Sequence, residues 1–224
     1  MSRAWQSAGR CVVLAACWLL LTTPEAAAQS RQQRQAPGPS FRGFGTVGMT
    51  VFSAADSFAA VFGSSIAPVF GGGIEVGLRP NLFVTVAASR FAQTGKRLFV
   101  FEDEVFDLNE PTEVRITPLE LSLGYRFAAS PRWRPYVAGG IGWHHYTETS
   151  PHATEGENVS ETFTGYHGLA GVEWPVHNWI SLAGEGQFTS VPNALGESPT
   201  SVGSVYDEHD LGGFSFRVKV IIGR

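Results

Sequence analysis

The chain has 224 residues with 16 basic and 20 acidic side chains, which gives a formal net charge of −4. An acidic chain without a basic cluster does not suit the phosphate backbone of DNA or RNA, so we expect no nucleic-acid partner. Both cysteines, Cys11 and Cys17, lie in the first 28 residues, so a chain that begins after them has no disulfides, thiolate nucleophiles or thiolate metal ligands.

Residues 1–28 have the organisation of a secretory signal peptide. Two arginines precede the apolar run Cys11–Leu21, and three alanines end at Ala28, where we predict cleavage. Cleavage there removes two arginines and one glutamate and leaves 196 residues with a net charge of −5. An alternative lipoprotein-type cleavage would place lipid on Cys17, but it shortens the apolar region below the usual range. As a membrane anchor the run is too short to span.

Residues 29–40 are rich in Gln, Arg and Pro, and we predict a short disordered lead-in. A single domain, 41–224, follows. It contains eight segments in which apolar residues alternate with small or polar ones, and each approaches the roughly 9 to 11 residues with which a tilted strand crosses a bilayer. The predicted strands cover residues 41–52, 68–78, 82–92, 114–127, 134–147, 162–174, 179–190 and 210–222.

The predicted connections alternate between long and short. The short ones, 79–81, 128–133 and 175–178, contain turn-forming residues. The long ones cover residues 57–67, 93–113, 148–161 and 191–209. Tight turns at one end and larger loops at the other are typical of outer-membrane barrels, with both termini on the short-turn side.

The last strand shows two opposite faces most clearly. Phe214, Phe216 and Val218 alternate with Arg217 and Lys219. A membrane barrel has this arrangement, with lipid outside and a polar lumen. A soluble ligand-binding barrel of the lipocalin type is the alternative from another class, but it would need the reverse assignment of the faces and would bury these charges.

Aromatic residues stand where strands are expected to meet the membrane interface. Tryptophan and tyrosine favour that position in membrane barrels, so we predict two aromatic girdles, one near the short turns and one toward the loops. The predicted girdle residues are Trp133, Trp143, Trp174, Trp179, Tyr146 and Tyr166.

The chain resembles the small eight-stranded outer-membrane barrels, such as the transmembrane domain of outer-membrane protein A and related porin-like barrels. Leu119 to Arg126 and Leu211 to Val218 are the segments most typical of them. The resemblance implies an all-β, antiparallel, up-and-down transmembrane barrel in the bacterial outer membrane. It also implies a monomer that contacts membrane lipid and lipopolysaccharide and is inserted by the outer-membrane assembly machinery. It brings no catalytic motif and no cofactor.

Charged residues recur on the predicted inward face. Counting from the short-turn ends places Glu75 level with Lys219 and Glu185 level with Arg217. Opposite charges at equal heights are expected to pair, because an unpaired buried charge is costly. We therefore predict a lumen plugged by salt bridges, since eight strands leave room for little beyond side chains. The predicted network comprises Glu75, Glu120, Arg126, Glu173, Glu185, Arg217 and Lys219.

Two inward histidines, His144 and His167, lie on adjacent predicted strands and are placed symmetrically about the loop between them. They could face each other across the ladder and bind a metal ion. Two ligands are too few for a structural zinc site, so we predict no metal and interpret both as lumen histidines.

The loops suggest two further chemistries. The residue types of an esterase or acyltransferase acting on envelope lipid occur in or beside the fourth loop, although without a recognisable motif; they are Ser190, Ser198, Ser201, His209 and Asp210. The second loop carries five carboxylates, Glu102 to Glu110, interleaved with apolar residues, which indicates a hairpin extending beyond the membrane or a partner-binding loop. Without the spacing of a calcium loop, a solvated acidic loop is expected.

We therefore predict a non-catalytic outer-membrane barrel with a structural or surface-interaction role. A narrow channel or transporter for a small solute or amphiphile is the first alternative. A barrel enzyme acting on envelope lipid is the second.

Overall fold

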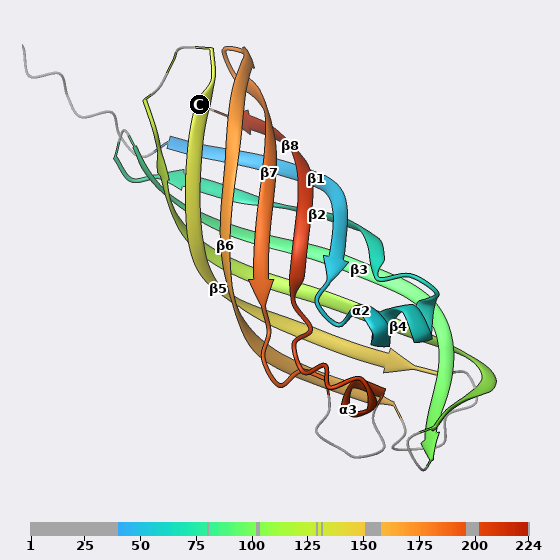
Figure 1. Ribbon diagram of the computed structural model, residues 1–224. Helices are drawn as coiled ribbons and strands as arrows, with labels where there is room; N and C mark the ends of the chain where they lie inside the picture. The colour runs from blue at the N-terminus through green and yellow to red at the C-terminus, as the bar shows by residue number, and fades with distance from the viewer. Residues whose placement is uncertain are drawn as a thin grey trace, which may run out of the picture. The chain divides into compact units, whose positions relative to one another are not determined.

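The computed structural model describes residues 40–79, 81–101, 104–128, 130, 132–150, 158–195 and 202–223. The predicted signal peptide and residues 29–39 of the predicted lead-in lie outside the described residues. The described residues form eight strands and two short helices, α2 and α3, which Figure 1 labels. The elements are β1 (Ser40–Phe52), α2 (Ala55–Phe62), β2 (Ile66–Gly77), β3 (Leu82–Phe101), β4 (Glu104–Arg126), β5 (Arg134–Thr149), β6 (Val159–His177), β7 (Ile180–Ser190), α3 (Val202–Val205) and β8 (Gly213–Gly223).

Each strand pairs with its neighbours in sequence, and β1 pairs with β8 to close the barrel. All eight pairings are antiparallel. The start of β1 and the end of β8 lie at the end that carries the short connections (Figure 1). Closure satisfies the backbone hydrogen bonds of every strand within the barrel, as a bilayer requires. The predicted all-β, eight-stranded antiparallel up-and-down barrel is confirmed.

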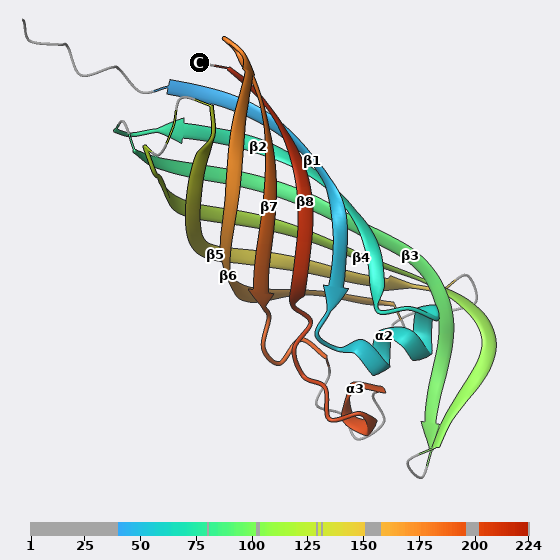
Figure 2. The same ribbon diagram turned by 45° about the horizontal axis from the view of Figure 1, so that its top comes forward.

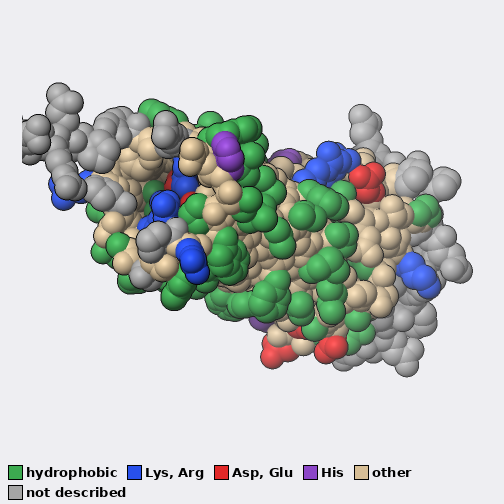
Figure 3. All heavy atoms as spheres, turned by 90° about the horizontal axis from the view of Figure 1, so that it is seen from above, with side chains coloured by type: hydrophobic (Ala, Val, Ile, Leu, Met, Phe, Trp, Pro, Cys, Tyr) green, Lys and Arg blue, Asp and Glu red, His purple; other side chains and the backbone are tan. Residues whose placement is uncertain are grey.

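The barrel wall is apolar on the outside and polar on the inside. Along β8, Phe216 and Val218 are 64% and 56% exposed, whereas Lys219, the next residue after Val218, is 5% exposed. Figure 3 shows hydrophobic side chains spread over the middle of the wall, with charged ones toward the two ends. This reversal of the usual burial pattern indicates a wall that faces lipid.

Among the described residues, no helix is long and apolar enough to cross a membrane.

The predicted strands 82–92 and 114–127 are too short, because β3 and β4 continue through most of residues 93–113 as the hairpin that the interleaved apolar residues indicated. The backbones of Leu98 and Phe101 pair with those of Asp107 and Glu104. The ladder between β4 and β5 begins at Glu113, whose partner on β3 is Thr94, and β3 continues for seven more residues to Phe101, about 23 Å at roughly 3.3 Å per residue. Alternating apolar residues favour strand over loop there.

The first long connection is not wholly irregular either, since it contains α2. The helix ends at Gly63, whose φ of 76° is the left-handed conformation that glycine adopts most easily. Figures 1 and 2 both show α2 at the loop end of the barrel, beside β3. A Cβ built on Gly95 of β3 would lie 2.7 Å from atoms of Val61 and Phe62, so the glycine allows this close approach.

Two groups of buried apolar residues fill the barrel. One lies toward the short-turn end around Phe83, Tyr136 and Ile221. The other lies at the loop end and includes Phe52 and Phe91. Charged and polar side chains occupy the lumen positions described next.

Candidate functional site in the barrel lumen

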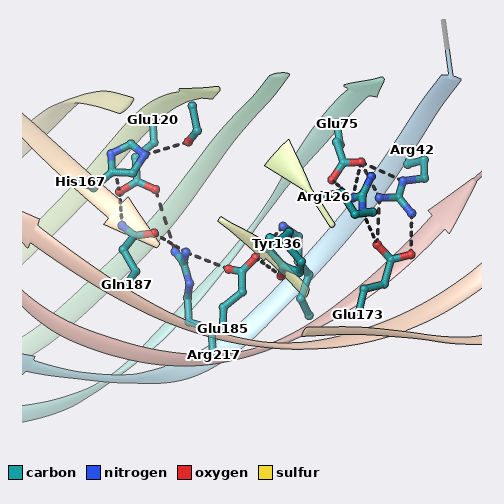
Figure 4. Close-up of polar contacts among 12 residues, drawn as sticks. Arg42, Glu75, Glu120, Arg126, Tyr136, His167, Glu173, Glu185, Gln187 and Arg217 are labelled. Atoms are coloured by element: carbon teal, nitrogen blue, oxygen red, sulfur yellow. Dashed lines mark hydrogen bonds and ion pairs between the residues drawn. The ribbon is translucent and has the colours of Figure 1, made fainter. Parts of the chain in front are cut away.

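All seven residues of the predicted lumen network lie on the inward face. Glu75, Glu173 and Glu185 are 2%, 0% and 5% exposed, which places their carboxylates out of contact with bulk water. Figure 4 shows these side chains reaching across the lumen toward one another from different strands. They form two networks, one at the short-turn mouth and one in the centre.

The mouth network consists of Arg42, Glu75, Arg126 and Glu173. Arg42 donates to Glu75 at 2.5 Å and to Glu173 at 2.8 Å. Arg126 lies 3.0 Å from Glu75 and 3.2 Å from Glu173, so each guanidinium bridges both carboxylates. Charge-assisted bonds of this type are short and directional. Outside this network the mouth opens into a cavity of about 940 Å³.

The central network is organised around Glu185. Its carboxylate accepts hydrogen bonds from Tyr136 Oη at 2.7 Å, Lys219 Nζ at 2.8 Å and Arg217 Nη2 at 3.0 Å. Lys219 Nζ also lies 4.0 Å from the centroid of the Phe44 ring. Three donors on one buried carboxylate satisfy it in place of water.

Glu120, Gln187 and His167 continue the central network toward the loops. Gln187 donates to Glu120 at 2.8 Å and accepts from Arg217. His167 Nε2 lies 2.8 Å from Ser122 Oγ, and its Nδ1 lies 4.0 Å from Glu120 Oε1. This order of groups is similar to a Ser–His–acid triad, but 4.0 Å exceeds a hydrogen bond. The cavity beside Ser122 measures about 20 Å³, which leaves no room for a substrate.

Together the two networks contain four cations and four anions. The cations are Arg42, Arg126, Arg217 and Lys219, and the anions are Glu75, Glu120, Glu173 and Glu185. Their charges cancel, and each lies within 4.0 Å of an opposite charge. The side chains fill the lumen at both levels.

The predicted pairing of Glu75 with Lys219 is wrong, whereas Glu185 and Arg217 are direct partners across β7 and β8. Glu75 instead lies opposite Arg42, which the sequence analysis missed. The error has a geometric cause. Strands in a barrel are staggered, so β1 pairs Thr46 with Lys219 and Arg42 with Glu75, two inward positions apart. Tyr136 was also missed, although its inward parity on β5 could have found it.

The prediction that His144 and His167 face each other across the ladder is also wrong. His144 lies opposite Phe163, and His167 lies opposite Gly140. Both are buried on the inward face, as expected of lumen histidines. Among the described residues, no group of three or more His, Cys, Asp or Glu side chains is placed to hold a metal ion.

Four phenylalanines, Phe52, Phe58, Phe62 and Phe91, form an aromatic cap at the loop end of the lumen. Phe52 and Phe58 stack with ring centroids 3.9 Å apart. Phe91 meets Phe52 and Phe62 edge-on at 5.3 and 5.9 Å. Two of the four belong to α2, so the helix closes the barrel above the central network.

A carboxylate from the last loop caps the N-terminus of α2. The helix has no side-chain cap at Ala54, and Glu208 instead accepts the backbone N–H groups of Asp56 and Ser57 at 3.0 and 2.8 Å. Partial burial acts to raise the pKa of Glu208. Hydrogen bonds from Ser57 and from the N–H groups of Asp56 and Ala55 outweigh it and hold that pKa below its ordinary value.

Five of the six predicted girdle residues are exposed on the outside or at the short-turn end. Trp133, Trp143, Trp174, Trp179 and Tyr166 are exposed. The prediction that Tyr146 belongs to a girdle is wrong, because the even-numbered positions of β5 point inward. It packs against the apolar cluster at the loop end and donates to Glu148 at 3.1 Å.

Of the loop residues considered for lipid chemistry, Ser198 and Ser201 lie outside the described residues, and Ser190, His209 and Asp210 do not form a triad. Asp210 accepts from Ser190 Oγ at 2.6 Å and from the backbone N–H of Val191 at 2.8 Å, so it fixes the start of the loop. His209 contacts Asp207 at 3.3 Å in an exposed position and does not contact Ser190.

A closed eight-stranded barrel with a lipid-facing exterior and a charge-neutral lumen defines the class of outer-membrane β-barrels. The model of the outer membrane protein beta-barrel domain family matches residues 13–210, and the chain belongs to that family. None of the curated proteins compared with the chain matches it. Barrels of this class have their short turns on the periplasmic side and their longer loops on the outer side of the membrane.

Solved structures share this fold. Neisserial surface protein A is 14% identical with a TM-score of 0.52, and the match covers 84% of this chain and 99% of that one. A major outer membrane protein from Thermus thermophilus is 10% identical with a TM-score of 0.55, and the match covers 84% of this chain and 100% of that one. At these identities the likeness shows the fold alone.

Proposed function

We propose that this protein is a non-conducting outer-membrane barrel that acts at the cell surface through its loops, in addition to supporting the membrane structurally. The observation that carries the proposal is the filled lumen. The mouth and central networks occupy two levels of the axis, and the aromatic cap covers the third. Within the described part of the barrel, the cavities beside Ser122 and beside His144 measure about 20 and 70 Å³, so each has room for only a few water molecules.

The β3–β4 hairpin is the element best placed for surface interaction. It continues past the last pairs with β2 and β5, at Arg90 and Glu113. Five carboxylates between residues 102 and 110 make this part of the sequence acidic. Binding function on barrel scaffolds commonly resides in such loops, because the rigid wall positions them.

The geometry also favours a non-enzymatic role. The hydroxyl of Ser190 is bound to Asp210, and His209 contacts Asp207 instead. Ser122 and His167 are buried beside a cavity too small for a lipid chain. Neither place combines a nucleophile, a base and room for substrate, which acyl transfer needs.

The partners we propose follow from the surface. Membrane lipid and lipopolysaccharide contact the apolar belt, and the assembly machinery of the outer membrane inserts the chain. Because the eight strands pair in a closed ring and none of them is an edge strand of the wall, we propose a monomer.

A shortened hairpin tests the surface role. Residues 96–111 are replaced by Asn-Gly, which joins the paired residues Gly95 and Thr112 by a two-residue turn and keeps the contact of α2 with Gly95. Cells that lack the protein are complemented with wild-type or shortened protein. Adhesion to polystyrene and autoaggregation report the surface role, and uptake of N-phenyl-1-naphthylamine reports envelope integrity.

We expect the shortened variant to restore envelope integrity but not adhesion or aggregation. A matched control keeps the hairpin length and neutralises its acidic residues as amides, so it separates charge from reach. The surface role is rejected if the shortened variant restores all three properties, and the structural role is rejected if deleting the protein leaves dye uptake unchanged.

A further inference from the structure

We propose that the loop end of the lumen is a binding site for a neutral amphiphile with a hydroxyl headgroup and a short alkyl chain, and that α2 is its lid. The site lies between the central network and the aromatic cap. This inference concerns binding inside the closed barrel and does not depend on the role of the surface hairpin.

A cavity of about 70 Å³ lies at this junction. Its lining combines apolar side chains, such as Phe52, Phe91 and Ile116, with polar ones, such as His144 and Arg217. A lining of both kinds suits a small ligand with an apolar part and a polar group.

Two buried nitrogen atoms of these polar side chains have no hydrogen-bond partner among the described residues. They are Nε2 of His144, a residue only 5% exposed, and Nε of Arg217, whose side chain is 10% exposed. Buried polar atoms are nearly always satisfied by protein, water or ligand. A hydroxyl can satisfy either atom, because its oxygen can accept from the Arg217 N–H, and it can donate to or accept from the imidazole nitrogen, whichever tautomer is present.

The charge balance of the lumen selects a neutral headgroup. The networks beneath the cavity already contain four cations and four anions, with Arg217 within 4.0 Å of both Glu120 and Glu185. A carboxylate or ammonium group added here would be an uncompensated buried charge, which is costly. An alcohol adds no charge and keeps the hydrogen bonds.

The barrel wall offers a route from the outer leaflet. The ladder between β2 and β3 ends at the pair Phe70 and Arg90, although β2 begins four residues closer to the loops at Ile66. Beside this end of the ladder, α2 packs against β3 at Gly95. The closed cavity is too small for an alkyl chain, so movement of α2 must both enlarge it and admit the ligand.

The test uses the full mature protein, labelled with ¹⁵N only at histidine, in lipid nanodiscs and titrated with 1-hexanol. We expect a saturable shift of the His144 side-chain signals and none at His177, which is exposed at the short-turn end. Hexanoate, the charged counterpart, should bind at least about tenfold more weakly, equivalent to roughly 1.4 kcal/mol.

Two glycine variants test the lid. Gly95→Ala places a methyl group 2.7 Å from Phe62 and Val61 and should push α2 outward, which raises the apparent affinity for hexanol several-fold. Gly168→Ala is the matched control, because a Cβ there meets nothing within 4 Å. It should leave the affinity unchanged.

Three results would overturn the proposal. His144 signals that stay unmoved in folded protein mean that the nitrogen is satisfied by water alone. Signals of His144 and His177 that drift together without saturation mean that hexanol only partitions into lipid. Equal affinities of the two glycine variants mean that α2 is not the lid.

Discussion

Replacing Glu185 by glutamine tests whether the lumen is held by compensated charges. The side chain of Glu185 is 1% exposed, and it is the carboxylate to which Lys219 is paired, at 2.8 Å. Glu185→Gln keeps the shape but removes the anion, which leaves the 6% exposed ammonium of Lys219 without a counter-charge. Removing one partner of a buried pair typically costs about 3–5 kcal/mol.

We expect a loss near the lower limit, about 3 kcal/mol, because the Phe44 ring still lies 4.0 Å from Lys219 Nζ and offers a cation–π contact. Adding Lys219→Met removes the stranded charge. The double variant should regain about 2 kcal/mol relative to Glu185→Gln, a coupling energy within the range for contacting residues.

The free energy of unfolding is measured by urea titration in phospholipid vesicles, with tryptophan fluorescence as the signal. The control is Glu113→Gln, which breaks an ion pair of 2.7 Å whose side chains are 43% and 47% exposed. An exposed pair contributes at most about 1 kcal/mol. The reasoning is refuted if Glu185→Gln costs no more than Glu113→Gln, or if Lys219→Met adds to the loss instead of reversing part of it.

Three further predictions concern the loop end and the packing of the lumen. Phe58→Ala removes a stacked ring of the aromatic cap and should cost about 3 kcal/mol in the same titration, while hydrogen exchange of residues 55–62 accelerates; unchanged exchange would contradict the cap. Because folding lowers the pKa of Glu208, its contribution is present above the unfolded value near 4.3 and is lost as pH falls through the lower folded value. The protection of α2 against hydrogen exchange, corrected for the intrinsic pH dependence of amide exchange, should therefore fall in acid for the wild type, whereas in Glu208→Gln it should be low at every pH; an acid-dependent loss of protection that persists in this variant would exclude the cap by Glu208. Gly124→Ala places a methyl group against the Phe83 ring, closer than van der Waals contact, and should cost about 1–3 kcal/mol by overpacking; a neutral effect in the urea titration would show that the ring moves freely.

The strands and their faces could be predicted from the sequence because a membrane barrel repeats one simple rule. Side chains alternate between lipid and lumen, so the residue pattern of β8 alone assigns Phe216 outward and Lys219 inward. The same parity places Tyr146 inward, although tyrosine as a residue type favours the membrane interface.

The pairing of charges could not be predicted from heights along the strands. Adjacent strands of a barrel are offset by the shear, so counting from the turns misplaced Glu75 by two inward positions relative to Lys219. The pair Glu185 and Arg217 could be predicted because β7 and β8 are adjacent strands whose short-turn ends pair directly, Ile180 with Ile222. Counting from those ends therefore gives the correct partners.

The closure of the loop end depends on contacts between distant residues. Glu208 caps a helix that lies 151 residues away, and neither the helix nor its partner has a local sequence signal such as a side-chain N-cap. Gly95 allows the helix to approach β3, but a glycine in a strand does not indicate what will contact it.

Single-channel recording of the refolded mature protein in planar bilayers tests the filled lumen most directly. Insertion is first established by the different migration of boiled and unboiled samples on gels. We predict inserted protein without reproducible openings, because the mouth network, the central network and the aromatic cap block the axis. Steady openings whose conductance falls in the double variant Glu185→Gln, Arg217→Met would contradict the account and show that the charged side chains line a path for ions.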